Sequence, residues 1–399
     1  MSTKRCSTLF FVANSRSLML NDTFHPGPTV VFVDDAPWEC FFQLAVILRK
    51  AGIRTVRVSV GLSKWHVDQI LFDRHVPLPF PPTPEQLADI LSSECVTDVQ
   101  PTESLAMTTY AALNLLPASQ RSDIWIGRSA FLDKWDVAST LRDLRIRTPD
   151  ALLAEFTSPI EAVAQLTFPI VLKRRVGSSG SGVEVFDSLE SLEQFVSRIE
   201  VISDWFYERF IHGQSLVCVI CVGSDGVDVI ANYEILKRVK PRGTSTVVEI
   251  LNDERITENG RMLIDAIHIR GLVCIDIIRD SNDIDWIHDV NPRVFGSFLT
   301  CQFGGFDFCD AYIRYLTGRD RFEPSRADDS GNKSFVFPYG IKEVFRSGQL
   351  GTAWFRALKW TWRYWRLLGS RYFLSLAIRG LAFSIRRNRE RQATGTTCD

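Results

Sequence analysis

The sequence predicts an α/β protein that ends in a helical tail, and three observations support this class. Short apolar runs alternate with helical segments over the first 125 residues, which is typical of a parallel sheet with helical crossovers. Further on, strand-like runs follow one another across turns, which predicts antiparallel pairing and an α+β core. After residue 353, apolar and basic residues recur at helical spacing. With 399 residues, the chain is long enough for two or three domains.

Charge and cysteine content indicate where the charges lie along the chain and in which redox state the thiols are expected. The chain carries 46 basic and 47 acidic residues, but ten basic and two acidic ones lie after residue 353, so a tail of +8 follows a body of −9. Cys218 and Cys221 are predicted to lie in one strand, where residues three apart point to opposite faces and do not share a metal. We expect reduced, mostly buried thiols in a cytoplasmic protein, because no signal peptide or membrane-spanning run is recognisable.

The first 125 residues are expected to form a Rossmann-like domain. Strands at Thr29–Asp34 and Thr55–Val60 flank a helix at Trp38–Gly52, which implies a parallel sheet with a right-handed crossover. The Pro-rich segment Leu71–Pro84 is expected to be a connector. Three further elements are predicted in chain order: a helix at Pro84–Leu91, a strand end at Val96–Gln100 and a helix at Ser104–Leu116. Asp34-Asp35-Ala36-Pro37 stands where a dinucleotide-binding turn is Gly-rich, which argues against a dehydrogenase.

A helix is expected next, at Phe131–Arg145. Lys134 lies one position from its apolar face, where a lysine is usually a surface charge. Four residues are available for the buried face: Leu132, Trp135, Leu141 and Leu144.

A loop rich in glycine and serine follows. A strand at Phe168–Lys173 runs through two arginines into Gly177–Gly182, and a second strand is predicted at Val183–Phe186. Backbone N–H groups of such a loop are unobstructed, and three cations precede it, so the loop favours phosphate binding. It is not a Walker A motif, because it opens into a strand. The alternative is a flexible hairpin tip.

The segment Trp205–Ile211 is apolar around Glu208. An acid in such a segment is expected beside a buried crevice, and an adenine base needs apolar walls with one or two hydrogen bonds at its edge. Strands are predicted at Leu216–Val222 and Val227–Lys237. The basic loop Lys237–Thr246 then suits an anionic ligand, and a helix is predicted at Thr257–Gly271.

Two further strands, Leu272–Ile278 and Trp286–Asn291, are joined by turn residues. If Asn282-Asp283 is the centre of this hairpin, Asp276 faces Asp289 directly, and Asn291 lies on the same face. Facing carboxylates repel unless a cation lies between them. The pattern therefore predicts a Mg²⁺ site, in which phosphate oxygens would complete the coordination shell of the ion. The alternative is a solvated acidic face.

Taken together, the motifs between Arg128 and Gly305 resemble the ATP-grasp superfamily of carboxylate–amine ligases. The resemblance implies an N-terminal pre-ATP-grasp domain and an ATP-grasp fold. It also implies phosphate contacts from Lys134 and Lys173, a mobile loop over the β- and γ-phosphates, and Glu208 as the adenine-binding acid. The loop residues are Gly177, Ser178, Ser179, Gly180, Ser181 and Gly182. The backbones of Arg209 and Ile211 would lie beside adenine.

The same resemblance implies a metal triad and a catalytic set. The metal ligands would be Asp276, Asp289 and Asn291, and Arg293 of the Asn291-Pro292-Arg293 motif would steady the phosphoryl group together with Lys173 and Asn291. Two positions depart from the family pattern. Ser215 stands where a Glu often binds the ribose, and Asp289 is one methylene shorter than the usual Glu, so the site is expected to hold either one or two metal ions.

The expected domains are 1–125, a pre-ATP-grasp unit; 126–205 and 206–320, the two ATP-grasp subdomains; and 321–399, a helical extension. The resemblance implies a ligase that uses ATP and Mg²⁺, or Mn²⁺, to activate a carboxylate as an acyl phosphate and join it to an amine. Two alternatives stay open. One is carboxylation or carbamoyl phosphate chemistry, and the other is an inactive nucleotide-binding adaptor.

The tail predicts a surface role. One stripe of the expected helix is basic, and aromatic residues occupy the adjoining face. The basic stripe comprises Arg356, Lys359, Arg363 and Arg366. Residues 354–391 suit the anionic inner face of a membrane without spanning it, and the alternative is packing on the acidic body or on a second subunit. Nucleic acid is not expected as a partner, because apolar bulk backs the basic stripe.

Overall fold

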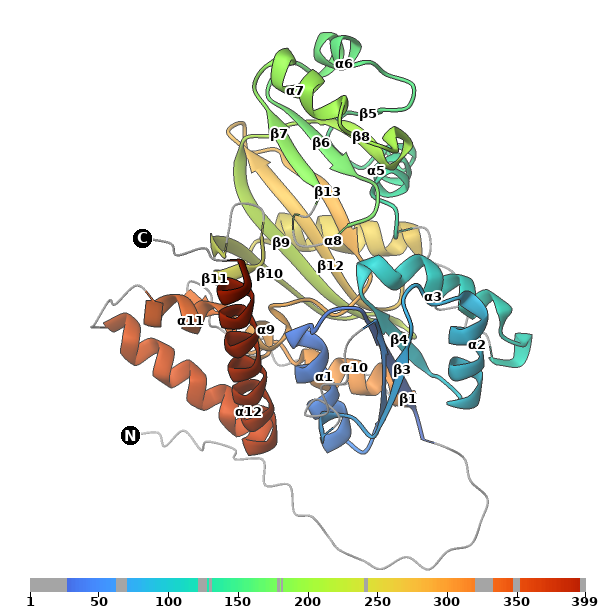
Figure 1. Cartoon of the computed structure of the whole chain (residues 1–399), viewed down its shortest axis with the longest axis vertical. Coiled ribbons are helices and arrows are strands. Elements are labelled where there is room, and N and C mark those ends of the chain that lie inside the picture. Colours follow the sequence, from blue (N-terminus) through green and yellow to red (C-terminus); the bar gives the residue numbers. More distant parts are fainter. Residues whose placement is uncertain are drawn as a thin grey trace, which may run out of the picture.

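The computed structural model describes most of the chain. The described residues are 27–61, 70–120, 128, 131–177, 180, 182–239, 243–319, 333–346 and 352–394. Three residues of the predicted phosphate loop, Ser178, Ser179 and Ser181, lie outside them. The fold is mixed α/β, as predicted, with three sheets (Figure 1).

The N-terminal sheet is parallel and has the strand order β3-β2-β1-β4. Its elements are β1 (Thr29–Asp34), α1 (Glu39–Lys50), β2 (Arg54–Val60), β3 (Arg74–Leu78), α2 (Pro84–Ser93), β4 (Asp98–Pro101) and α3 (Glu103–Leu115). The expectation of a connector at Leu71–Pro84 was wrong, because this segment contains β3. Pro77 is compatible with β3 because β3 is an edge strand, where a missing N–H breaks no sheet hydrogen bond.

A four-stranded sheet with the order β5-β8-β6-β7 comes next. Its strands are β5 (Ala151–Leu153), β6 (Ile170–Arg174), β7 (Val183–Phe186) and β8 (Trp205–Arg209). The helices of this part are α5 (Lys134–Asp143), α6 (Pro159–Leu166) and α7 (Leu189–Val196), with short 3₁₀ turns at Ala118–Gln120 and Ile202–Asp204. The prediction that Leu144 is buried was wrong. It lies just beyond the end of α5 and is 38% exposed, because Val137, Ala138 and Leu141 form the buried face.

The largest sheet has six antiparallel strands in the order β13-β12-β9-β10-β11-β14. These are β9 (Gly213–Gly223), β10 (Gly226–Arg238), β11 (Ser245–Leu251), β12 (Gly271–Asp280), β13 (Asp285–Asn291) and β14 (Lys333–Phe335). The helices after β11 and β13 are α8 (Glu254–Ile267), α9 (Phe298–Phe303) and α10 (Phe308–Thr317). Cys218 and Cys221 do lie in different hydrophobic clusters, as expected for opposite faces of β9. The described cysteines are free thiols, and all but Cys95 and Cys309 are buried.

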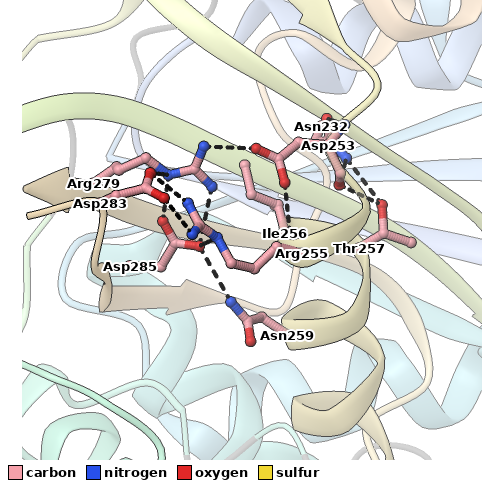
Figure 2. Close-up of polar contacts among 9 residues, drawn as sticks. All are labelled: Asn232, Asp253, Arg255, Ile256, Thr257, Asn259, Arg279, Asp283 and Asp285. Carbon is pink, nitrogen blue, oxygen red and sulfur yellow. Dashed lines mark hydrogen bonds and ion pairs between the residues drawn. The ribbon is translucent and has the colours of Figure 1, made fainter.

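A polar network fastens α8 to the hairpin β12–β13 (Figure 2). Arg279 of β12 pairs with Asp253 at 2.6 Å and with Asp285 at 2.7 Å, and Arg255 of α8 pairs with Asp283 and Asp285. Asp253 also caps α8 by accepting the backbone N–H of Ile256. The network therefore holds one end of the hairpin that carries the predicted metal ligands.

The C-terminal part consists of α11 (Tyr339–Arg346) and α12 (Thr352–Thr394). Gly369, with φ of 78° and ψ of 173°, breaks α12 into two helical segments that meet at a sharp bend (Figure 1). Helix α12 packs on α1 and α11, and in its first segment the rings of Trp360 and Tyr364 contact Phe303 of α9 within the main core. No helix in the described part of the chain is long and apolar enough to span a membrane.

Candidate active site

A cavity of about 660 Å³ lies between the four-stranded and the six-stranded sheets. Most of the predicted site residues line it. These are Lys134, Lys173, Gly177, Gly180, Glu208, Arg209, Ile211, Ser215, Asp276, Asp289, Asn291 and Arg293. A cavity of this size falls within the range typical of sites for small-molecule ligands.

Asp276 and Asp289 are opposite each other in the β12–β13 register, as the hairpin pattern predicts. Burial and the facing Asp289 raise the pKa of Asp276 to about 6. Burial alone would also raise the pKa of Asp289, but Lys134, whose Nζ lies 2.5 Å from Asp289 Oδ2, outweighs it and lowers this pKa to about 2. Asn291 donates from Nδ2 to Asp276 at 3.2 Å. The side chains of Asp276, Asp289 and Asn291 thus lie close together, and Lys134 already neutralises the charge of Asp289.

A β-bulge in β13 changes which of its side chains point into the cavity. Asp276 pairs with Asp289, but the next residue, Ile277, pairs with Ile287, so His288 is the extra residue of β13. His288 and Asp289 therefore both line the cavity, although neighbours in a regular strand point to opposite faces. Burial and the charge of Lys173 lower the pKa of His288 to about 3, which leaves a neutral imidazole. The regular hairpin register hid this residue from sequence reasoning.

Lys173 and Glu208 form a buried ion pair across neighbouring strands β6 and β8. Their side chains are 9% and 5% exposed. Burial raises the pKa of Glu208 against the opposing effect of Lys173. The sequence indicated both residues separately but not the pair, because strand order decides which strands are neighbours.

Lys134 and the glycine loop are joined at the N-terminus of α5. Asp133 caps this helix by accepting the Trp135 N–H at 2.8 Å, and it also pairs with Arg175 at 2.8 Å. The backbone N–H of Lys134 donates to the carbonyl of Arg175 at 2.9 Å. The segment leading into the loop is thus held beside the helix that carries Lys134.

In the loop itself, Gly180 and Gly182 have φ of 73° and 72°. These values favour glycine. Ile211 and Ser215 lie along the same cavity wall as Glu208. Arg209 already uses its backbone N–H and its guanidinium on Asp150.

The far end of the cavity is built partly by the N-terminal domain. Arg293 is held by Glu103, by Asn291 Oδ1 at 3.2 Å and by the ring of Trp38, whose centroid lies 4.6 Å from the guanidinium carbon. Trp38 and Glu103 follow β1 and β4, where the strand order of the parallel sheet changes direction. Ligands bind at such a point in open α/β sheets, and this rule was the signal that could have located both residues.

A family model described as an ATP-grasp domain matches residues 131–297. The chain contains an ATP-grasp domain. This match confirms the ATP-grasp domain predicted from the sequence, and the three sheets with their helices confirm the predicted fold class. No curated protein matches the sequence.

Solved structures share the fold of this chain at low sequence identity. A carboxyaminoimidazole ribonucleotide synthase from Aspergillus clavatus, complexed with ATP, is 14% identical with a TM-score of 0.64, covering 75% of this chain and 79% of that one. The biotin carboxylase domain of a Hydrogenobacter thermophilus 2-oxoglutarate carboxylase, solved as a dimer with MgADP and bicarbonate, is 16% identical with a TM-score of 0.60, covering 77% and 73%. An N5-carboxyaminoimidazole synthetase from Staphylococcus aureus, complexed with ADP, is 12% identical with a TM-score of 0.60, covering 80% and 96%.

Proposed function

We propose that this ATP-grasp protein activates a small-molecule carboxylate as an acyl phosphate and joins it to an amine, forming an amide or peptide-like bond. One observation carries the proposal: a single cavity gathers two lysines, the Asp276–Asp289 pair and Arg293, and continues beyond them to a second set of walls. A phosphoryl group could therefore meet a carboxylate within one enclosed space.

In this proposal, the nucleotide lies between the two sheets. Glu208 and the backbone near Ile211 would bind adenine, and Lys134, Lys173 and the loop 177–182 would contact the phosphates. Water exclusion by the loop would protect the acyl phosphate from hydrolysis.

Mg²⁺ fits the donor set. Asp276, Asp289 and Asn291 supply the hard oxygen ligands that Mg²⁺ prefers, and Mn²⁺ accepts the same set. Among the described residues, no group of three or more His, Cys, Asp and Glu side chains is arranged to hold a metal. Because Lys134 also pairs with Asp289, a single ion fits better than two. When bound, the ion would neutralise charge on the transferring phosphoryl group.

Side chains of the protein would position the reacting groups. Lys173 and Arg293 would orient the γ-phosphate towards the attacking carboxylate oxygen, and Asn291 would keep Arg293 in place through its side-chain oxygen. An amine would then attack the acyl carbon, phosphate would leave, and the nitrogen would lose its proton. Cations and loop N–H groups would stabilise the oxyanion formed on the way.

The decisive experiment is ADP release with a panel of carboxylates, with and without amines. Amine-dependent release with an amide product supports the proposal. Release with bicarbonate alone would instead favour carboxylation or carbamoyl phosphate chemistry, for which the shared fold of the biotin carboxylase domain is the specific reason. No release with any substrate would indicate a nucleotide-binding adaptor.

A variant pair tests the metal assignment. We expect Asp289→Ala to abolish ADP release while the protein stays folded, because it removes one of two facing carboxylates. Asp283→Asn is the matched control, since this carboxylate is on the same hairpin but 71% exposed. Full activity of Asp289→Ala would refute the assignment.

We also propose that α12 binds an anionic membrane surface. Its apolar side is buried in the core, but Phe355, Leu358, Trp362 and Trp365 remain 72%, 39%, 58% and 45% exposed on the opposite side. Exposed cations lie beside them, at Lys359, Arg366 and Arg371. A helix with aromatic and basic side chains on one exposed face suits the interface of anionic lipid.

Point variants test this surface better than deletion, because deleting residues 354–399 would remove Trp360 and Tyr364 from the core. We expect Trp362→Ser with Trp365→Ser to lower binding to phosphatidylserine vesicles by at least about tenfold, since a buried apolar side chain contributes about 1.5–3 kcal/mol. Met262→Ser, on exposed α8, is the control. Two results would refute the proposal. One is equal vesicle binding by the wild type and the double variant. The other is a wild-type protein that does not bind vesicles but forms a dimer, which the double variant dissociates.

A further inference from the structure

The walls of the cavity have two origins. The half between β6, β8, β12 and β13 is built by residues within the matched ATP-grasp domain, 131–297. The other half also includes Trp38, Glu39 and Cys40 at the start of α1, Phe337 just before α11, and Tyr339 at the start of α11. These segments lie outside the matched domain, so this half is where the chain can differ in substrate from other proteins of the fold.

The side chains of this second half are mainly aromatic. Trp38, Phe337 and Tyr339 line it together with Phe295 and Tyr233. Its acids are already compensated. Glu39 binds Arg379 at 2.7 Å and accepts the hydroxyl of Tyr372 at 2.7 Å, and Glu103 pairs with Arg293. The wall is therefore suited to an apolar or aromatic group rather than to a cation.

Two polar groups remain available in this region. Arg238 donates from Nη1 to the carbonyl of Gly243 at 3.0 Å, which leaves the rest of its guanidinium for a ligand. The hydroxyl of Tyr339 has no hydrogen-bond partner among the described residues, and this side chain is half-buried in the wall. Burial and nearby Glu39 raise the pKa of Tyr339 to about 12, so its hydroxyl remains a donor.

The wall is held by α12. Gln43 donates to the carbonyl of Phe337 at 3.2 Å and to the Tyr372 hydroxyl at 3.2 Å, and Tyr372 in turn donates to Glu39. The ring of Phe337 stacks on Tyr364, with centroids 4.7 Å apart and an interplanar angle of 27°. Such a wall is preformed, and preformed apolar surfaces with one polar group select ligands by shape.

We propose that Trp38, Phe337 and Tyr339 bind the body of the carboxylate substrate, and that this body is aromatic or apolar. The carboxylate would point towards Arg238, and the Tyr339 hydroxyl would donate to a polar atom of the substrate. This inference rests on the proposed function, because it identifies the substrate class of that same site.

Hydroxylamine capture tests the inference without knowledge of the amine. Hydroxylamine attacks the acyl phosphate, the C–O bond to phosphate breaks, and a hydroxamate, phosphate and a proton are released. The probes are acetate, phenylacetate, 4-hydroxyphenylacetate and bicarbonate, each with Mg²⁺ and ATP. We expect kcat/KM for the two aromatic acids to exceed that for acetate by about 10- to 100-fold, from burial of the ring.

Variants locate the effect. Tyr339→Phe is expected to raise KM for 4-hydroxyphenylacetate by about three- to tenfold, the effect of one lost hydrogen bond, with KM for ATP unchanged. Phe337→Ala is expected to remove the preference for an aromatic body. Tyr315→Phe is the matched control, since it removes a tyrosine hydroxyl outside the cavity lining.

The outcomes separate the two proposals. Absence of hydroxamate with every acid would refute the acyl phosphate function itself, and the substrate class with it. Hydroxamate formed equally well from acetate and phenylacetate, preference for bicarbonate, or an unchanged KM in Tyr339→Phe would overturn the substrate class and leave the function standing.

Discussion

Asp276→Asn is expected to stabilise the metal-free protein while abolishing ATP turnover. The pKa of Asp276 is raised from 3.8 to about 6 by burial and by Asp289. Keeping this group ionised at pH 7 therefore costs the folded state about 3 kcal/mol. Asparagine removes the charge and can still accept the hydrogen bond that Asn291 donates. At pH 7 the variant should gain up to about 3 kcal/mol in free energy of unfolding.

The stability gained from Asp276→Asn should depend on pH. The folded pKa lies above the unfolded one, so the cost of the charge is absent below about pH 3.8, grows as the pH rises and is complete above about pH 6. The gain from asparagine should therefore shrink to about half at pH 5. Urea unfolding in EDTA at pH 5 and pH 7 measures both values.

Asp283→Asn provides a control of opposite sign, because Arg255 lowers the pKa of Asp283 and the charge there is favourable. Added Mg²⁺ should stabilise the wild type more than Asp276→Asn. If Asp276→Asn is less stable than the wild type in EDTA, or if its gain is the same at both pH values, the reasoning about facing carboxylates is refuted.

Three further predictions concern the same region. Lys134→Met should shift the acid limb of the pH profile of ADP release upward, because Lys134 lowers the pKa of Asp289 to about 2, and an unchanged limb would contradict this. Gly182→Ala should raise KM for ATP severalfold, since φ is 72° and a Cβ would lie 2.7 Å from Cβ of Arg174; an unaltered KM would count against the loop. Arg279→Leu should lower the free energy of unfolding by about 2–4 kcal/mol in urea, because Asp253 loses its ion-pair partner and Asp285 keeps only Arg255, and a loss below about 1 kcal/mol would show that the network in Figure 2 is dispensable.

Local pattern was sufficient for much of the fold. The β–α–β unit at the start and the strand Val183–Phe186 were predicted at or near their observed bounds, because strand and helix periodicities are properties of neighbouring residues. β3, β5, β8, β11 and β14 were not predicted as strands. β3 contains a proline, and its strand form depends on its position at a sheet edge.

The candidate site divides in the same way. The predicted hairpin placed Asp276 opposite Asp289, but the pairs beside the turn are one residue out of the predicted register, and the bulge at His288 is what brings the two carboxylates opposite each other. The predicted hairpin could not reveal His288, because a bulge depends on how the two strands twist and pack. Nor could it reveal the Lys173–Glu208 pair, which requires β6 and β8 to be neighbours.

The sequence by itself determined the family, the order of the motifs and the amphipathic character of the tail, since all three are contained in residue types and spacings. Only the tertiary structure decided which side of α12 is buried, that Arg293 rests on Trp38, and that Tyr339 enters the cavity. These contacts join segments hundreds of residues apart. They depend on which distant elements pack against one another, and the spacing of residues along the chain does not specify that choice.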